Sequence, residues 1–95
     1  PGTPAEHEGR RAFILVEEFV IGRDPKKVDL CLPDPSIGRM HARIVRRAGS
    51  FFICDLGSGN GTHLDGRRLP KHEEYLLPDQ CLLQFADQLF YFQAE

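Results

Sequence analysis

Cysteine is scarce in this chain of 95 residues, and tryptophan is absent. The three cysteines are Cys31, Cys54 and Cys81, an odd number, and each lies within an apolar segment. Cysteines of this kind behave as small hydrophobes, so we expect buried free thiols in a reducing compartment, that is, an intracellular location in the cytoplasm or nucleus. The cysteines and histidines also show no paired ligand spacing, which argues against a metal site.

Long apolar runs and an excess of charge of one sign are also missing. No run is long enough to span a membrane, and no signal-peptide pattern is present. The formal net charge is −2, so no basic face indicates direct binding of nucleic acid. A hydrophobic fraction of 41% over 95 residues supports one core. We therefore expect a single domain that neither enters a membrane nor binds polyanions in general.

Amphipathic helical spacing is the third absence. Short apolar segments instead recur about every ten residues with turn residues between them, which predicts an all-β fold of the sandwich type. The strongest hairpin signal is the Asp65-Gly66 pair between two such segments. We expect about ten to eleven short strands, including 12–16, 19–21, 28–32, 42–45, 51–54, 62–64, 67–69, 75–77, 81–85 and 89–92.

The N-terminal segment, residues 1–9, is rich in proline, glycine, glutamate and histidine and shows no apolar periodicity. Such a composition is typical of a connecting segment. We therefore expect residues 1–9 to be a flexible linker and residues 10–95 to form the domain.

The most distinctive stretch reads Asp-Leu-Gly-Ser-Gly-Asn-Gly-Thr, in which Gly57, Gly59 and Gly61 alternate with Ser58 and Asn60. Glycine reaches positive φ at little cost and lets another backbone approach, while Ser and Asn favour turns. No Gly-Lys-Ser/Thr sequence follows, and an Asp-Gly turn follows where a helix is needed, so Walker-type and dinucleotide phosphate loops are excluded. A simple connection and an exposed binding loop on a β scaffold remain as interpretations.

Three short motifs occur in a fixed order, each beside an expected strand. They are Gly22-Arg23, Arg39-Met40-His41 and Asn60-Gly61-Thr62. In this order and spacing, the chain resembles the forkhead-associated (FHA) domain over residues 13–93. The resemblance implies a two-sheet β sandwich whose loops at one end bind a phosphothreonine peptide of a partner protein. It also implies an adaptor module without cofactor or metal rather than an enzyme, and we expect the isolated domain to be a monomer.

The resemblance assigns phosphate contact to Arg23, and the chemistry of arginine agrees with that role. Phosphothreonine carries nearly two negative charges and three acceptor oxygens. A guanidinium binds phosphate through two donors at once and stays charged at physiological pH. The alternative is a surface arginine paired with Asp24. Asn60 matches the family's asparagine that holds the peptide backbone; the alternative is a turn former, and the two roles are compatible.

The remaining matched positions belong to the family's structural motif. They are Gly22, His41, Gly61 and Thr62. The resemblance implies that His41 ties loops together by hydrogen bonds. A catalytic interpretation of His41 with Asp55 and Ser58 lacks the sequence context of an activated nucleophile.

Two positions depart from the family pattern. The family usually has serine at the start of Ser-x-x-His, where this chain has Gly38, and threonine or serine before Asn-Gly, where it has Gly59. Two hydroxyl contacts to a ligand are therefore missing. Backbone amides of both glycines, a second guanidinium and nearby hydroxyls could replace them, with Lys26 and Lys27 adding positive potential. The expected ligand contacts are Arg23, Gly38, Arg39, Ser58, Gly59 and Asn60, with Ser36 as a further hydroxyl.

Two hypotheses follow from this mixture of retained and missing residues. The first is a phosphothreonine-dependent adaptor that reads the output of a Ser/Thr kinase through a rewired pocket. The second is a degenerate FHA domain that binds a protein partner without phosphate, through a sheet face or another loop. The two dibasic pairs, Arg46-Arg47 and Arg67-Arg68, read most simply as solvated turn flanks.

Overall fold

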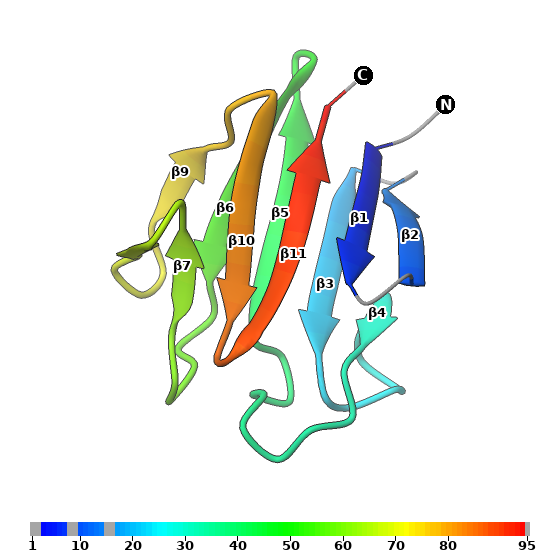
Figure 1. The fold of residues 1–95 in the computed structure, drawn as a ribbon, viewed down its shortest axis with the longest axis vertical. Helices are drawn as coiled ribbons and strands as arrows, with labels where there is room; N and C mark the ends of the chain where they lie inside the picture. Colours follow the sequence, from blue (N-terminus) through cyan, green and yellow to red (C-terminus); the bar gives the residue numbers. More distant parts are fainter. Residues whose placement is uncertain (1–2, 8–9, 15–16, 95) are drawn as a thin grey trace.

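The computed structural model describes residues 3–7, 10–14 and 17–94. These residues form eleven strands and no helix (Figure 1). The strands are β1 (Thr3–His7), β2 (Arg10–Ile14), β3 (Glu18–Gly22), β4 (Leu30–Cys31), β5 (Ala42–Arg47), β6 (Ser50–Asp55), β7 (Thr62–Leu64), β8 (Arg67–Arg68), β9 (Glu74–Leu76), β10 (Gln80–Phe85) and β11 (Gln88–Gln93).

The strands form two sheets packed face to face. The six-stranded sheet has the order β2-β1-β11-β10-β7-β8, and the five-stranded sheet has the order β4-β3-β5-β6-β9. The all-β, two-sheet sandwich predicted from the sequence is confirmed. No helix among the described residues is long and apolar enough to cross a membrane.

Tight turns with left-handed residues connect the hairpins. Asp65 and Gly66 between β7 and β8 have φ of 49° and 84°, the pair of positive values that a type I′ turn requires. Ala48 and Gly49 between β5 and β6 have φ of 49° and 81°. The Asp-Gly hairpin predicted from the sequence is therefore present.

The core lies between the sheets and follows the two-residue period of the strands. In β10, Leu83 and Phe85 point inward and are about 1% exposed, and in β11 Phe92 is fully buried. Ile44 of β5 and Ile53 of β6 face them from the other sheet and are also buried. Cys54 and Cys81 are buried free thiols, whereas Cys31, expected to be buried as well, is only half-buried.

The N-terminal segment differs from the linker that its composition predicted. Thr3–His7 forms β1, which pairs antiparallel with β2 and with β11, where Ala5 lies opposite Phe92. Backbone pairing uses N–H and C=O groups that every segment carries, so it needs no apolar alternation in the sequence. Residues 3–7 are therefore part of the six-stranded sheet, and the other residues of the expected linker lie outside the described ranges.

Candidate functional site

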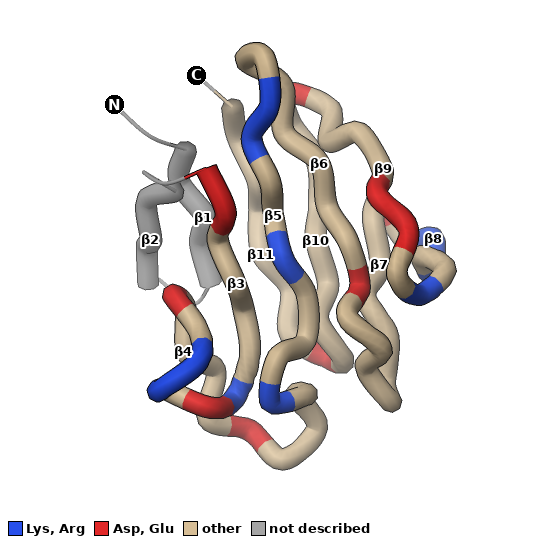
Figure 2. The backbone as a smooth tube through the Cα atoms, turned by 180° about the vertical axis from the view of Figure 1, so that it is seen from behind, with Lys and Arg blue, Asp and Glu red and all other residues tan. Residues whose placement is uncertain are grey.

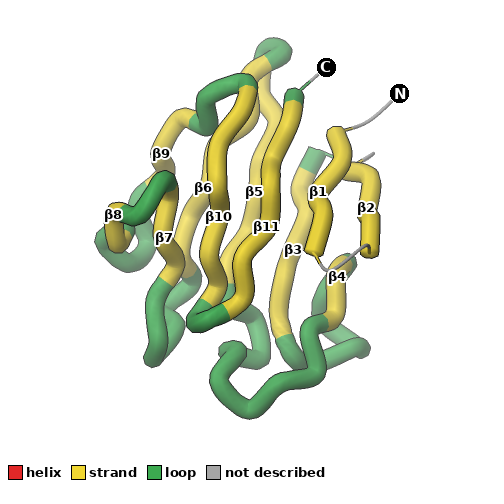
Figure 3. The backbone as a smooth tube through the Cα atoms, viewed as in Figure 1, coloured by secondary structure: helices red, strands yellow, loops and turns green. Residues whose placement is uncertain are grey.

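Four connections meet at one end of the sandwich, the lower end in Figure 3. They are the β3–β4 loop, the β4–β5 loop, the glycine loop between β6 and β7, and the β10–β11 turn. All three motifs singled out in the sequence lie in or beside these loops. Hydrogen bonds between the loops hold them in one arrangement, as the following contacts show.

Asp55, the last residue of β6, organises the glycine loop from beneath. Its side chain is 1% exposed. One carboxylate oxygen, Oδ2, accepts the N–H groups of Gly57 and Ser58, both at 3.0 Å. The other, Oδ1, accepts the hydroxyls of Ser58 at 2.5 Å and Thr62 at 2.7 Å. Both ends of the loop are therefore fixed to one carboxylate.

These bonds decide the charge state of Asp55. Burial alone raises the pKa of a carboxyl group, because the charged form loses its hydration. The hydrogen bonds from Ser58, Thr62 and the backbone of Gly57 outweigh that effect, so the pKa of Asp55 lies below its ordinary value. The side chain is consequently an ionised acceptor at neutral pH.

His41 joins the glycine loop to the β4–β5 loop. Its ring is fully buried. Nδ1 accepts the N–H of Gly38 at 2.9 Å, and Nε2 lies 2.8 Å from the carbonyl oxygen of Gly61. A carbonyl can only accept, so Nε2 carries the proton and the ring is the neutral tautomer. Both ring nitrogens of His41 are occupied by backbone groups, so this side chain is not free to act as a base.

Gly22 allows the β4–β5 loop to cross directly over the end of β3. A Cβ built on Gly22 would lie 2.2 Å from the carbonyl oxygen of Arg39, so no other residue fits without moving the backbone. The next residue then bonds across the gap: the N–H of Arg23 donates to Gly38 O at 2.9 Å. This close approach fixes where Arg23 leaves the strand.

The side chain of Arg23 is exposed and only partly engaged. Its Nε donates to the carbonyl oxygen of Ile37 at 3.0 Å, and no other hydrogen bond or ion pair joins it to the described residues. Its side chain is not paired with Asp24, whose carboxylate instead accepts the N–H of Lys26 at 3.0 Å. Both terminal Nη groups of Arg23 are therefore available, while the Nε bond orients the guanidinium.

Further positive charge lies nearby. Arg39 is exposed and its guanidinium has no partner among the described residues, and Lys26 and Lys27 are exposed in the β3–β4 loop. Blue segments of these two loops lie at the same end of the molecule in Figure 2, with acidic residues interspersed. The site thus presents several exposed cationic side chains in a chain whose net charge is −2.

Asn60 spans from the glycine loop to the β4–β5 loop. Its amide nitrogen donates to the carbonyl oxygen of Ser36 at 2.8 Å, which leaves Oδ1 and the second N–H without a partner among the described residues. The Ser36 hydroxyl donates to Asp34 at 2.6 Å, and this bond contributes most to holding the pKa of Asp34 below its usual value. Ser36, Asn60 and Asp87 line an open depression of about 320 Å³.

Gly38 and Gly59 leave open space where a hydroxyl side chain would stand. A Cβ on Gly59 would meet nothing within 4 Å, and one on Gly38 would touch only His41 at ordinary contact distances of 3.5 Å or more. Neither glycine has a positive φ. Neither glycine is therefore required by the backbone or by packing.

Ser58 was expected to contact a ligand, but its side chain is not placed to do so. Its side chain is 4% exposed, its hydroxyl donates to Asp55, and the same oxygen accepts the N–H of Gly61 at 3.0 Å. A hydroxyl committed in both directions and covered by protein cannot reach a ligand. Ser58 shapes the loop, as do Gly61 and Thr62.

Sequence reasoning missed Arg68 of β8. Its Nη2 approaches the carbonyl oxygen of Gly59 at 3.5 Å, and its guanidinium lies over Gly61, where a Cβ would come within 2.8 Å of Nε. Only the pairing of β8 with β7 brings this residue to the glycine loop.

Asp55 was noted at the start of the loop. The only feature of the sequence that indicates its structural role is the Asp-x-x-Ser spacing, which favours turns in which the carboxylate accepts backbone N–H groups. Among the described residues, no cluster of three His, Cys, Asp or Glu could hold a metal ion.

A family model of the FHA domain matches residues 19–86. The chain belongs to the FHA domain family. It is 42% identical over 68 residues to an oxoglutarate dehydrogenase inhibitor of Corynebacterium diphtheriae, covering 72% of the chain and 46% of that relative. It is 32% identical over 81 residues to Smad nuclear-interacting protein 1 of Mus musculus, covering 72% and 21%. The chain spans less than half the length of these FHA-containing relatives.

Solved FHA structures superpose over almost the whole chain. EmbR of Mycobacterium tuberculosis, solved in complex with a low-affinity phosphopeptide, gives a TM-score of 0.91 at 27% identity, covering 99% of this chain and 24% of that one. The MEK1 FHA domain, solved with a phosphothreonine peptide of HOP1, gives 0.86 at 25% identity, covering 99% and 97%. The FHA architecture therefore accounts for the entire described fold.

Proposed function

We propose that this FHA domain is a phosphothreonine-dependent adaptor that binds a phosphorylated segment of a partner protein at its loop end. The observation that supports it most is the state of Arg23. The guanidinium is oriented through Nε on Ile37 O and keeps both Nη groups available at an exposed site. Two similar FHA proteins have been solved with phosphopeptides, which agrees with this assignment.

Each retained residue has a distinct task in this proposal. Arg23 donates its Nη groups to the phosphate oxygens, and Arg39 adds a second guanidinium. Asn60, already held by Ser36, keeps an acceptor and a donor for the peptide backbone beside the phosphorylated residue. Because His41 and Asp55 fix the loops before a ligand arrives, little ordering entropy is lost on binding.

A second function, a phosphate-independent scaffold, is favoured by the missing hydroxyls at Gly38 and Gly59 and by the burial of Ser58. A hydrogen bond to a charged group contributes roughly 1.5–3 kcal/mol. Losing two without replacement would weaken binding by roughly a hundredfold to a few ten-thousandfold, since each 1.4 kcal/mol is about tenfold. The two functions differ in one observable, the dependence of binding on phosphate.

The deciding experiment compares one degenerate peptide library in three forms, with phosphothreonine, phosphoserine or unphosphorylated threonine at the fixed position. We expect binding of the phosphothreonine form only. Arg23→Ala should weaken that binding at least about tenfold, because it removes a charge-assisted contact. Equal binding of phosphorylated and unphosphorylated libraries would overturn the adaptor assignment and support the scaffold.

Arg46→Ala is the matched control. Arg46 is an exposed arginine of the β5–β6 hairpin, at the opposite end of the sandwich from the loops (Figure 1). Its guanidinium lies 5.8 Å from the Phe51 ring centroid and takes part in no ion pair with the described residues. The control removes the same charge as Arg23→Ala and should leave phosphopeptide affinity unchanged.

A further inference from the structure

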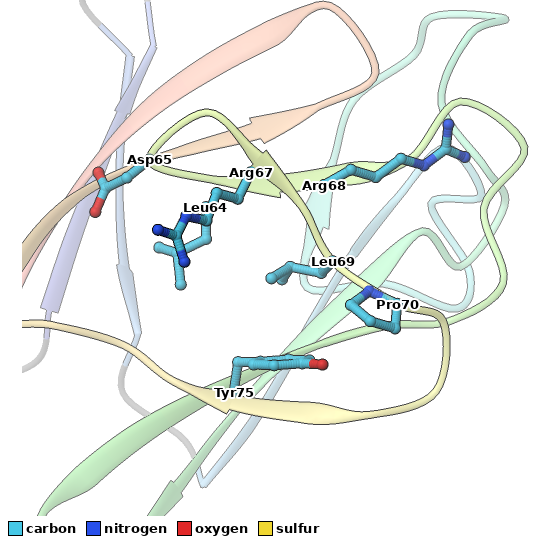
Figure 4. Close-up of a pocket in the computed structure, with 7 residues that line it drawn as sticks. All are labelled: Leu64, Asp65, Arg67, Arg68, Leu69, Pro70 and Tyr75. Atoms are coloured by element: carbon cyan, nitrogen blue, oxygen red, sulfur yellow. The ribbon is translucent and has the colours of Figure 1, made fainter.

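A groove of about 510 Å³ lies on the side of the sandwich, between the β7–β8 hairpin and β9 (Figure 4). Its floor is apolar and is formed by Leu64, Leu69 and Tyr75. Leu69 is 7% exposed and belongs to the core, and the other two are half-buried and pack against it. The groove therefore opens onto the core itself.

Two sheet edges border this groove. β8 is the outermost strand of the six-stranded sheet, and β9 is the outermost strand of the five-stranded sheet. The outer edge of each has no strand partner among the described residues. Figure 4 shows Leu64 and Leu69 directed into the groove from one side and Tyr75 from the other. Open strand edges are the parts of a sheet to which an extended peptide adds.

Of the charged residues that line the groove, Arg67 is the one whose side chain lies over it. Arg67 lies over the groove in Figure 4 and has no hydrogen bond or ion pair with any described residue. Arg68 points away from the groove, toward the glycine loop, where Nη2 lies 3.5 Å from Gly59 O. The Asp65 carboxylate is directed away from the groove in Figure 4, and its Oδ1 accepts the N–H of Leu82 at 2.9 Å. An unpaired arginine beside an apolar floor is complementary to an apolar side chain that adjoins a carboxylate.

We propose that this groove binds an extended segment of a partner protein in which a bulky apolar residue adjoins an aspartate or glutamate. The apolar side chain packs between Leu64 and Tyr75, and the carboxylate pairs with Arg67. The edge of β9 or β8 supplies backbone hydrogen bonds to the same segment. This surface is separate from the loop end, and binding to it requires no phosphate.

The test is a titration of the ¹⁵N-labelled chain followed by amide chemical shifts. The probe is a capped, unphosphorylated peptide, Gly-Asp-Glu-Phe-Asp-Gly, with one matched peptide carrying lysine in place of each acid and another carrying serine in place of phenylalanine. We expect the acidic peptide alone to shift the amides of Leu64, Arg67, Leu69 and Tyr75. The affinity of such a small contact is weak, with a Kd of the order of a millimolar.

Arg67→Glu should weaken this binding at least about tenfold, because attraction becomes repulsion at the rim. Arg46→Glu is the matched charge reversal on the other dibasic pair and should change the Kd less than about twofold, since screening limits distant charges. Both substitutions lie at exposed positions, and unchanged shifts elsewhere will verify folding. Tyr75→Ala removes the apolar side chain that β9 contributes to the groove and should also weaken peptide binding.

Three outcomes would overturn the groove assignment. They are no shifts in the groove at millimolar peptide, equal binding of the acidic and basic peptides, and shifts confined to Arg23, Arg39 and Asn60 at the loop end. Arg23→Ala should leave the groove titration unchanged, whereas it should abolish phosphopeptide binding. Failure of the unmodified domain to bind any phosphopeptide would therefore contradict the adaptor function and leave the groove assignment standing. Absence of peptide binding in the groove would overturn the groove assignment and leave the adaptor function standing.

Discussion

Gly38 and Gly59 are the two residues that separate this binding site from the usual FHA pattern. The space at both positions is open, and neither backbone requires glycine. We predict that Gly38→Ser and Gly59→Thr each raise affinity for a phosphothreonine peptide about tenfold or more, because each adds a hydroxyl donor to a charged ligand. Isothermal titration of each variant with one peptide measures this.

Gly38→Ala and Gly59→Ala are the controls for that gain. They add the same Cβ and the same loss of backbone freedom without the hydroxyl. Affinity that rises equally in the alanine variants would assign the gain to loop stiffening and contradict a hydroxyl contact. Unchanged affinity in both series would place the phosphate away from these two positions.

Asp55 is the residue on which the shape of the glycine loop depends. In Asp55→Asn, an N–H₂ group replaces one oxygen and faces donors, so at least two of the four bonds are lost in a buried site. We predict a loss of about 2–4 kcal/mol in the free energy of unfolding at pH 7, measured by urea denaturation. Wild-type stability in that variant would show that water or loop movement replaces the carboxylate.

The same substitution has a defined pH dependence. The folded pKa of Asp55 is lowered, so its contribution is complete above the unfolded pKa of about 4 and is lost as pH falls through the folded value. The difference in unfolding free energy between wild type and Asp55→Asn should therefore shrink from pH 7 toward pH 2–3, roughly the range below that pKa. A difference independent of pH would contradict an ionised Asp55 in the native state.

At the scale of strands and loops, Gly22 sets the junction between β3 and the β4–β5 loop. We predict that Gly22→Ala costs about 2 kcal/mol or more in stability and weakens phosphopeptide binding, since the Cβ forces Arg39 O away and displaces Arg23. Urea denaturation and peptide titration measure the two effects. Gly59→Ala, with open space around its Cβ, is the control and should retain stability. Equal losses in both variants would show that the close approach of Gly22 to Arg39 O does not cause the loss of stability.

Strands and hairpins could largely be predicted from the sequence because they depend on local signals. The Asp65-Gly66 turn and the strand expected over 81–85 are read directly from neighbouring residues. β4 is an exception: the expected strand 28–32 contains only Leu30–Cys31, since a two-residue parallel pairing with β3 depends on tertiary contacts. β1 was not foreseen, because pairing with β11 is likewise non-local.

The binding loops were located by motif, but the direction of their side chains could not be predicted. Ser58 and Asn60 are both small, polar loop residues in the same stretch. One is buried against Asp55 and the other donates to Ser36 O of another loop, and the local sequence does not distinguish the two. Arg68 was read as a solvated turn flank because its neighbour in space, Gly59, belongs to another loop.

For the whole molecule, the cysteines report whether the two sheets unfold together. Cys54 of β6 and Cys81 of β10 are 3% and 4% exposed and lie in different sheets, whereas Cys31 is half-buried beside the loop end. Burial raises the pKa of both core thiols, that of Cys81 to about 11, so the reactive thiolate is scarce in the native state. We predict that one thiol, Cys31, reacts rapidly with a thiol reagent in the native protein at pH 8.

The other two thiols should react only through unfolding. Both sheets contribute to a single core, in which Phe51 of β6 packs against Phe92 of β11 with ring centroids 5.5 Å apart, so opening one sheet exposes the other. Cys54 and Cys81 should therefore show the same free energy of opening across a urea series, as read by mass spectrometry of the labelled peptides. Cys31→Ser should abolish the fast phase alone. Labelling of Cys81 at lower urea than Cys54 would show that the six-stranded sheet opens first, and that the sandwich is not one cooperative unit.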